Sequence, residues 1–224
     1  MNIKGIIFDA DGPLYFRDKD SYDPKIKLLK KFGYIGNYKK FEDSYEKEKW
    51  LRFVGKISNT ELIRRTIKDI DLMLDSQSLK LFTKEFLELH KKVKLAKGIL
   101  KVLGDLKKSK IIICVLTDTV FSKKEKQNLF KNIGMDKYID KIVCSCDIKK
   151  LKDTKEAYEE CLKRMRLRAN EVIFVGHKEY EMKGANKANI ISVAILSISE
   201  RNIKADYLLR STKELAKFVN KITV

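Results

Sequence analysis

The stretch KGIIFDADGPLYF, residues 4–16, places two carboxylates, Asp9 and Asp11, directly after a short apolar run. The run IIF at residues 6–8 is typical of a buried strand, and the pair GP at residues 12–13 ends it. In an open α/β sheet, a carboxylate at the carboxyl end of a strand points into the crevice where such sheets bind ligands. The stretch therefore predicts a core strand that ends in a binding or reactive site.

Two carboxylates at this spacing can divide a reaction between them. One of them can attack an electrophile such as phosphorus and form a covalent acyl-phosphate. The other can donate a proton to the leaving oxygen and later take one from water. Because two acids and a phosphate repel each other, the site needs a lysine, a divalent cation or both. Taken alone, the letters DADG also fit a turn with helix-capping acids, so the rest of the chain has to decide.

The bulk composition indicates a folded chain with a sizeable core. It has 224 residues, of which 44% are hydrophobic, with two prolines and ten glycines. This length suits one large domain or a core with a smaller insert. No apolar run is long enough to cross a bilayer, and the first residues lack the pattern of a signal peptide. We therefore expect no membrane partner and a cytoplasmic location.

The formal net charge is +18, from 49 basic and 31 acidic residues. The lysines are spread along the chain, so most of them are expected to line solvated faces, and we do not expect nucleic acid as a partner. A small phosphorylated metabolite, the partner that we do expect, would benefit from the same positive field. The four cysteines include no CxxC pair, and with two histidines a structural zinc site is not expected. Cys114 and Cys144 lie in apolar runs and are predicted to be core thiols. The sequence leaves open a monomer or a homodimer.

Strand-like and helical patterns alternate outside one region. The predicted strands are residues 4–10, 111–118, 141–147, 171–177, 190–196 and 205–210. Helical patterns cover residues 98–109, 154–165 and 211–222, and the last two open with a Thr or Ser as expected N-cap. Continuous apolar strands that alternate with helices predict an α/β fold with a parallel, doubly wound sheet covered on both faces.

Residues 17–92 contain only helical patterns. The four candidate helices are residues 24–34, 38–54, 59–73 and 78–93. The last of these spaces five apolar residues at three and four positions, which predicts one buried stripe: Leu79, Phe82, Phe86, Leu89 and Val93. We therefore predict a core formed by residues 1–16 and 93–224 and an inserted, all-helical cap formed by residues 17–92.

Four short stretches follow one another in a fixed order: DADG at 9–12, VLTDT at 115–119, KDTKEAY at 152–158 and FVGHKEYEMKGA at 174–185. Their order and spacing resemble the signatures of the haloacid dehalogenase (HAD) superfamily, in particular its phosphoglycolate phosphatase-like members with a helical cap. The resemblance implies a Rossmann-like parallel core. It also implies hydrolysis of small-molecule phosphate monoesters through an aspartyl-phosphate, with a divalent cation, normally Mg²⁺.

The resemblance also implies a role for each matching residue. Asp9 is expected to be the nucleophile and a metal ligand. Asp11 is expected to be the general acid/base, and its backbone carbonyl a further metal contact. Thr117 is expected to hold a phosphoryl oxygen, and Lys152 to neutralise Asp9 and the phosphate, with Lys150 as the alternative lysine. An acid at position 11 favours phosphoryl transfer, because the dehalogenases and phosphonate hydrolases of the superfamily do not keep it.

The fourth stretch departs from the pattern. His177 stands where the family has its first metal-binding Asp, Glu181 stands in place of the second, and Pro13 replaces a Thr or Val. Three readings stay open. Glu181 supplies the missing carboxylate, with Glu179 as a poorer stand-in; or His177 selects a softer ion such as Mn²⁺; or metal binding is weakened and the chain is a binding protein on an enzyme scaffold.

The loop LRFVGKIS, residues 51–58, lies between two predicted cap helices. The resemblance implies that such a loop covers the active site and favours small substrates over proteins. Arg17, at the expected hinge, is a further candidate for a role in substrate binding. The residues expected to contact the substrate are Gly12, Asp118, Arg52, Gly55 and Lys56.

Overall fold

The computed structural model describes residues 2–17, 22–198 and 202–222. The chain divides into two compact units, of which the first comprises Met1–Phe16 and Leu95–Val224 and the second Arg17–Lys94. The observed division falls two residues later than the boundary expected after residue 92.

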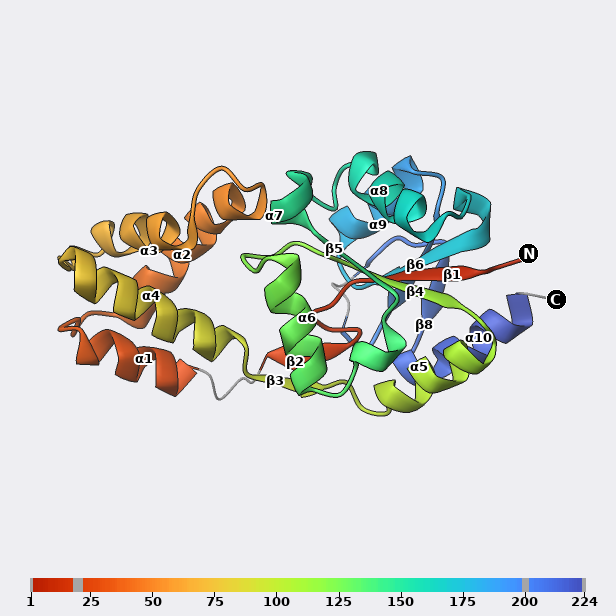
Figure 1. The fold of residues 1–224 in the computed structure, drawn as a ribbon, viewed down its shortest axis with the longest axis horizontal. Helices are drawn as coiled ribbons and strands as arrows, with labels where there is room; N and C mark the ends of the chain where they lie inside the picture. The colour runs from red at the N-terminus through yellow and green to blue at the C-terminus, as the bar shows by residue number, and fades with distance from the viewer. Residues whose placement is uncertain (1, 18–21, 199–201, 223–224) are drawn as a thin grey trace. The chain divides into compact units, whose positions relative to one another are not determined.

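A six-stranded parallel sheet runs through the first unit in the order β5-β4-β1-β6-β7-β8 (Figure 1). Its strands are β1 Gly5–Phe8, β4 Ile112–Thr117, β5 Lys141–Cys144, β6 Val172–Gly176, β7 Ile191–Ile195 and β8 Tyr207–Leu209. The six predicted strands are confirmed, each a few residues shorter than its apolar run. The α/β fold with a parallel sheet is confirmed with them.

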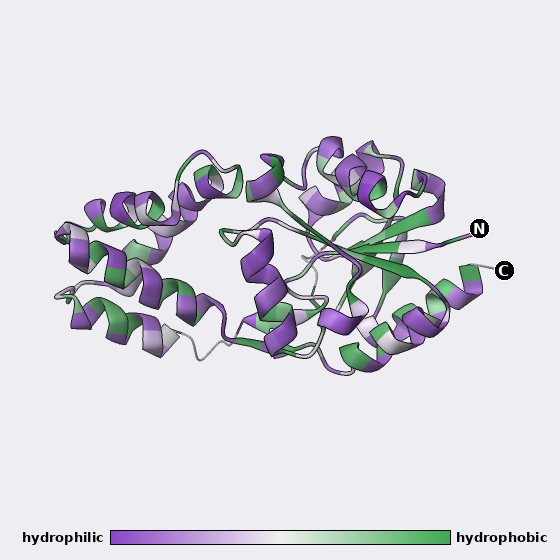
Figure 2. Cartoon of the chain, in the orientation of Figure 1, coloured by the Kyte–Doolittle hydropathy of each residue, from purple (hydrophilic) through white to green (hydrophobic). Residues whose placement is uncertain are grey.

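The first strand lies in the middle of this sheet. It pairs with β4 on one side and β6 on the other, and Ile6, Ile7 and Phe8 are fully buried. Figure 2 shows the strands of this sheet in the colours of apolar residues. Cys114 of β4 and Cys144 of the edge strand β5 are buried free thiols, as predicted. Burial on both faces explains why these strands appear as continuous apolar runs.

Helices flank the sheet of the first unit. They are α5 Ile99–Lys108, α6 Lys123–Asn132, α7 Ser145–Ile148, α8 Lys155–Met165, α9 Glu179–Lys187 and α10 Leu215–Ile222, with the 3₁₀ turns η2 Asp136–Tyr138, η3 Ala169–Glu171 and η4 Thr212–Glu214. Thr154 stands at the N-cap position of α8 and Ser211 at that of η4, as expected, but neither side chain caps its helix. The Thr154 hydroxyl donates to the Leu151 carbonyl at 2.7 Å, and Ser211 precedes η4 without a side-chain cap. At Thr154 a local bond to the backbone thus takes the place of the cap.

The second unit contains α1 Tyr22–Lys31, α2 Tyr38–Phe53, α3 Asn59–Lys68 and α4 Ser76–His90, as the helical patterns predict. Asn37, Ser58 and Asp75 cap the last three helices through hydrogen bonds from backbone N–H groups. Phe41, Phe82 and Phe86 pack together, with the ring of Phe41 edge-on to the other two, and form the aromatic centre of this unit.

The predicted apolar stripe runs past the end of its helix. Helix α4 ends at His90, and Val93 belongs to β3 Val93–Leu95, which pairs with β2 Tyr15–Arg17. These two short strands lie where the chain passes from one unit to the other. They have three residues each, too few for period-two alternation to be recognised in the sequence.

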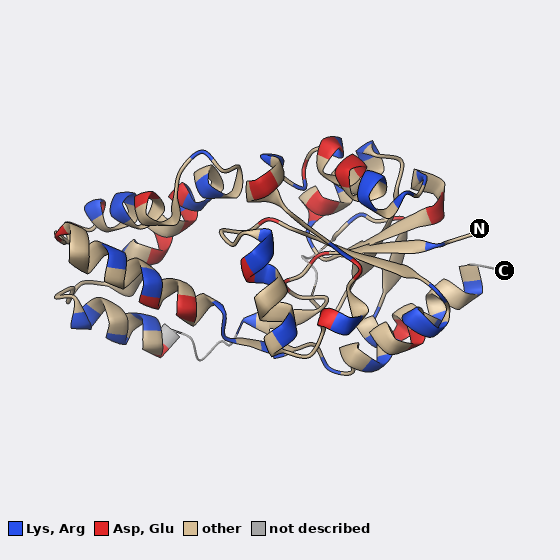
Figure 3. Cartoon of the chain, in the orientation of Figure 1, with Lys and Arg blue, Asp and Glu red and all other residues tan. Residues whose placement is uncertain are grey.

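Figure 3, in which Lys and Arg positions are coloured blue, shows such positions on helices throughout both units. This distribution agrees with the even spread of basic residues along the sequence. In the described part of the chain, no helix combines the length and the apolar character that a membrane crossing requires.

Candidate active site

The ends of three neighbouring strands define the site. Phe8 of β1 is paired with Val115 of β4 and with Val175 of β6, and all three strands run in the same direction. The residues that follow these partners, Asp9 and His177 among them, therefore meet at one edge of the sheet. The Asp9 N–H donates to the Val175 carbonyl at 2.9 Å, which fixes the residue at this edge.

Three buried charged side chains meet there. The Lys152 ammonium lies 2.6 Å from Asp9 Oδ1 and 2.5 Å from Glu181 Oε1. Their exposures are 2% for Lys152, 3% for Asp9 and 0% for Glu181, so solvent screens the interaction little. Lys150, the alternative lysine, is exposed. The loop before α8 therefore brings Lys152, and not Lys150, to the strand-end carboxylate.

Burial and charge act against each other on these groups. Burial alone would raise the pKa of Asp9, but the Lys152 charge and neighbouring His177 hold that pKa below its ordinary value. Burial would lower the pKa of Lys152, yet Asp9 and Glu181 keep it well above its ordinary value. Burial and the Asp9 charge raise the pKa of Glu181. The arrangement thus favours an ionised Asp9 beside a charged lysine, as a carboxylate nucleophile requires.

Lys152 is also held through its backbone. Its N–H lies 3.3 Å from Asp118 Oδ1, and the Tyr180 hydroxyl donates to Asp118 Oδ2 at 3.3 Å. The Lys152 carbonyl lies so close to Gly184 of α9 that a Cβ there would come within 1.8 Å of it. The Tyr158 hydroxyl donates to the Glu181 carbonyl at 2.7 Å and ties α8 to α9. Two helices and the end of β4 thereby position the lysine.

Burial raises the pKa of Asp118 to about 6. The charge of Lys152 acts in the opposite direction, and the charge of Asp9 adds to the effect of burial. This carboxylate was expected to contact the substrate. In the structure its oxygens face the Lys152 N–H and the Tyr180 hydroxyl. These contacts, which the sequence did not suggest, fit a residue that holds the Lys152 loop, and the predicted contact of Asp118 with the substrate stays a prediction.

The residues beside Asp9 form a tight turn. Asp11, half-buried, forms a bridge with Tyr15, and the Gly12 N–H donates to the Tyr15 carbonyl at 2.7 Å. Gly12 has a φ of +95°, which favours glycine, and a Cβ there would lie 3.2 Å from the His177 imidazole. Thr117 ends β4 and is buried. The turn thus leaves Asp11 accessible and leaves room for His177.

A metal ion is implied by the resemblance, and the donor set fits one. Ligand atoms of Asp9, His177 and Glu181 all lie within 4.8 Å of one another. His177 Nδ1 lies 3.3 Å from Asp9 Oδ2, is buried and has no hydrogen-bond partner of suitable geometry. A buried nitrogen left in this state beside a carboxylate oxygen is a suitable metal ligand.

The expected substrate contacts from the cap lie within the second unit. Arg52 is half-buried near the end of α2, and its Nε donates to Asn59 Oδ1 at 2.9 Å. Gly55 has a φ of +67° in the turn between α2 and α3, and Lys56 is exposed there. Arg17, the hinge candidate, is exposed. The turn exists as predicted, and its role in substrate binding stays a prediction.

Residues 6–195 match the family model described as haloacid dehalogenase-like hydrolase. The chain belongs to this family. It is 24% identical to the glyceraldehyde 3-phosphate phosphatase of Methanocaldococcus jannaschii over 229 residues, 98% of each chain. This agrees with the order of the four signatures along the chain.

Solved structures of the same fold include members with different reactions. A 2-haloacid dehalogenase from Pseudomonas syringae aligns with a TM-score of 0.76 and 17% identity, covering 98% of this chain and 99% of that one. A β-phosphoglucomutase from Clostridium difficile aligns with a TM-score of 0.67 and 20% identity, covering 99% and 97%. These likenesses show the fold, and the side chains of the hydrolase site must indicate the reaction.

Sequence reasoning missed Tyr180 as a member of this hydrolase site. Its hydrogen bond joins residues 62 positions apart, and its ring centroid lies 5.9 Å from the Lys152 ammonium. A tyrosine in the first turn of a helix carries no signal of such a contact. The backbone bonds of Glu181 were missed for the same reason, since they depend on how β6 turns into α9.

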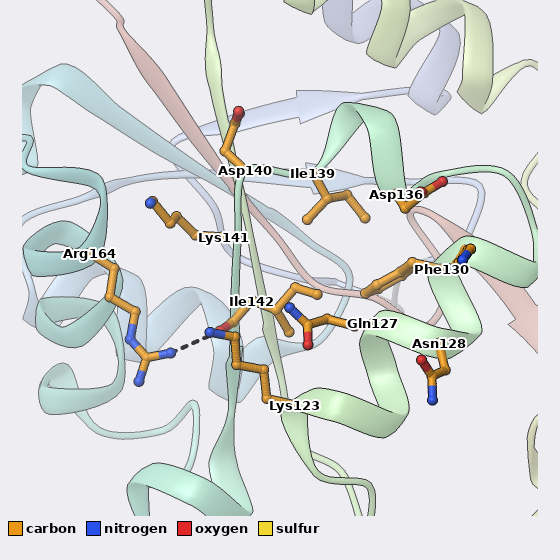
Figure 4. Close-up of a pocket in the computed structure, with 11 residues that line it drawn as sticks. Lys123, Gln127, Asn128, Phe130, Asp136, Ile139, Asp140, Lys141, Ile142 and Arg164 are labelled. Atoms are coloured by element: carbon orange, nitrogen blue, oxygen red, sulfur yellow. Dashed lines mark hydrogen bonds between the residues drawn. The ribbon is translucent and has the colours of Figure 1, made fainter.

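A separate hollow of about 350 Å³ lies between α6 and the edge strand β5 (Figure 4). Its charged lining residues are Lys123, Lys131, Lys141, Arg164, Asp136 and Asp140. The Arg164 guanidinium donates to the Ile142 carbonyl of β5 at 2.9 Å. The hollow shares no residue with the strand-end site of this hydrolase, so we assign it no part in the chemistry.

Proposed function

We propose that this hydrolase cleaves phosphate monoesters of small metabolites through an aspartyl-phosphate on Asp9. The observation that carries the proposal is the buried contact of 2.6 Å between Asp9 and Lys152 at the carboxyl edge of the sheet. The phosphatase name of the M. jannaschii relative, which matches along 98% of both chains, supports a phosphate ester as substrate.

The two oxygens of Asp9 have different surroundings. Oδ1 accepts hydrogen bonds from Lys152 at 2.6 Å and from the Ala10 N–H at 2.8 Å, whereas Oδ2 faces His177.

The carboxylate attacks phosphorus, a P–O bond to Asp9 forms, and the P–O bond to the ester oxygen breaks. Asp11 donates the proton that the leaving alcohol needs, then takes one from the water that cleaves the acyl-phosphate. Thr117 holds a phosphoryl oxygen.

A divalent cation, Mg²⁺ in most members of the family, would be held by Asp9 and His177, with Glu181 beside them. When bound, it supplies positive charge against the phosphate dianion. Lys152 supplies the second positive charge from the protein itself, and Asp118 and Tyr180 keep the loop of Lys152 in place.

The substrate is a small phosphorylated metabolite, and Arg52, Gly55 and Lys56 of the cap turn are its proposed contacts outside the core. Arg52 can bind a carboxylate or a second phosphate bidentately. The alternative, a catalytically weakened binding protein, rests on His177 and Pro13. It is disfavoured because a scaffold without turnover would gain nothing from keeping Asp9 and Glu181 buried around one lysine.

The test is hydrolysis of an aryl phosphate, followed by a panel of phosphorylated metabolites, with Mg²⁺, Mn²⁺, Co²⁺ and Ni²⁺ in parallel. We expect Asp9→Asn to lower turnover at least about a thousandfold, because the amide cannot form the acyl-phosphate. Asp153→Asn is the matched control, since this exposed aspartate follows Lys152 directly and should leave turnover unchanged. Turnover that survives in Asp9→Asn would contradict the mechanism.

A further inference from the structure

Glu181 has little capacity left to bind an ion. Its Oε1 lies 2.5 Å from the Lys152 ammonium, and its Oε2 accepts the N–H groups of His177 at 3.1 Å and Lys178 at 3.2 Å. A carboxylate oxygen has two lone pairs, so Oε2 is fully used by these two bonds. The residue is completely buried, and its carboxylate closes the turn from β6 into α9.

The Nδ1 atom of His177, unlike the oxygens of Glu181, is not occupied by a hydrogen bond. It is buried and lies closer to Asp9 Oδ2, at 3.3 Å, than to Glu181 Oε2, at 3.8 Å. The absence of a side chain at Gly12 leaves space for the imidazole. One imidazole nitrogen and one carboxylate oxygen therefore face each other at 3.3 Å, in a geometry that makes no good hydrogen bond.

The width of this gap suits an ion. Two neighbouring ligand atoms on an ion with bonds of about 2.1 Å lie roughly 3.0–3.4 Å apart, for octahedral and tetrahedral geometry respectively. The separation of Asp9 Oδ2 and His177 Nδ1 falls in this range, and that of His177 Nδ1 and Glu181 Oε2 lies beyond it. The distance between Asp9 Oδ2 and His177 Nδ1 thus suits two ligands of one ion, whereas Glu181 Oε2 lies too far from His177 Nδ1 for the same ion.

We propose that the site of this chain is built for a first-row transition-metal ion bound through Asp9 Oδ2 and His177 Nδ1, and that Glu181 is a positioning residue which does not coordinate it. Mg²⁺ prefers oxygen ligands, whereas an imidazole nitrogen favours Mn²⁺, Co²⁺, Ni²⁺ or Zn²⁺. The proposal deepens the proposed function, because it concerns the cation of the same site. Its test measures binding without substrate, so it can fail or succeed independently of turnover.

The first experiment is a titration of the full-length protein with Co²⁺, followed through its visible absorption, with Mg²⁺ as competitor. We expect wild type to hold Co²⁺ against about a hundredfold excess of Mg²⁺, and His177→Asp to release it at least about tenfold more readily. The four cysteines are buried, so no cobalt–thiolate absorption band should appear. Equal displacement by Mg²⁺ in both proteins, or a thiolate band, would overturn the proposal.

The second measurement uses the low histidine content. The chain has two histidines, so the imidazole nitrogen resonances of His177 can be compared directly with those of His90. On titration with Zn²⁺ we expect the Nδ1 resonance of His177 to shift and the resonances of His90 to stay in place. A shift at Nε2 instead of Nδ1, or no shift at His177, would overturn the assignment.

Two variants of α9 separate coordination from positioning. Glu181→Gln keeps an oxygen for the backbone N–H groups, and we expect Co²⁺ affinity to stay within about threefold of wild type. Its turnover should nevertheless fall, because Lys152 loses a charged partner. Glu179→Gln, whose carboxylate accepts the Lys204 N–H at 2.9 Å, is the matched control for both readouts. A loss of Co²⁺ in folded Glu181→Gln as large as that in His177→Asp would show that Glu181 is a ligand.

Discussion

The Lys152 ammonium forms ion pairs with two buried carboxylates at once. With Asp9 and Glu181 ionised, the three side chains carry one net negative charge in a place that solvent does not reach. Leaving a buried charge without its partner typically costs about 3–5 kcal/mol, so each member of this cluster constrains the other two. In that state, the remaining negative charge would favour a cation beside His177.

The raised pKa of Asp118 predicts a pH effect on stability. The carboxyl group titrates near its ordinary 3.8 in the unfolded chain and at about 6 in the folded protein, chiefly because it is buried. The folded state thus binds more protons in this window, and stability falls as pH rises from about 4 to about 6. We expect the melting temperature of Asp118→Asn, relative to wild type, to rise across the window and level off above pH 6. A difference that does not depend on pH would contradict this.

The sequence predicted the candidate reactive residues better than the residues that hold them in place. Asp9 follows a recognisable core strand, and Lys152 lies at a fixed spacing before Tyr158 of helix α8. The structure brings these two together as the motifs imply. The Tyr180–Asp118 bond could not be predicted, because a contact over 62 positions depends on the packing of α9 against the strand ends. Likewise, a glutamate in place of an aspartate gives no sign that its oxygens bind backbone N–H groups.

Among the elements, α9 is the one that holds the site most directly. A Cβ on Gly184 would lie 1.8 Å from the Lys152 carbonyl and 2.8 Å from the Tyr158 ring. We expect Gly184→Ala to destabilise the protein by about 1–3 kcal/mol despite the better helix propensity of alanine, and to lower turnover by displacing Lys152. Denaturant unfolding and the aryl phosphate assay measure the two effects.

Gly104 of α5 offers the matched helix control. A Cβ there would meet only an atom of the Tyr138 ring, at 3.8 Å, which is an ordinary contact. Gly104→Ala should therefore leave turnover unchanged and stabilise the protein by about 0.5–1 kcal/mol. If both alanines had the same effect, the close approach of α9 to the Lys152 loop would not be the cause.

The elements that the sequence predicts are those with strong periodic patterns. The strands of the core sheet are continuous apolar runs, and α4 has a buried stripe at helical spacing. The short elements β2, β3 and α7, of three or four residues each, have no room for a period and were missed. Thr154 shows a different limit, because its hydroxyl can bond to a nearby carbonyl as easily as it caps a helix.

For the whole molecule, the formal charge of +18 predicts how fast an anionic substrate arrives. A positive field raises the encounter rate with anions, and salt screens that field beyond roughly 10 Å at 0.1 M. We expect kcat/KM for a phosphate monoester to fall a few-fold between about 20 and 300 mM salt, with kcat changing less. The measurement should give the same result in NaCl and KCl. A kcat/KM that does not change with salt would show that the charge has no steering effect.

The central place of β1 has a consequence for synthesis on the ribosome. Its partners β4 and β6 begin at Ile112 and Val172, so the apolar run of the first strand emerges long before either neighbour exists. At roughly 5–20 residues per second, the wait for β6 lasts on the order of ten to thirty seconds. The helical segment Arg17–Lys94 forms a compact unit of its own, and we expect that it can fold meanwhile. The nascent chain thus exposes an apolar strand until its later neighbours are made, and we expect a holding chaperone to bind at that strand.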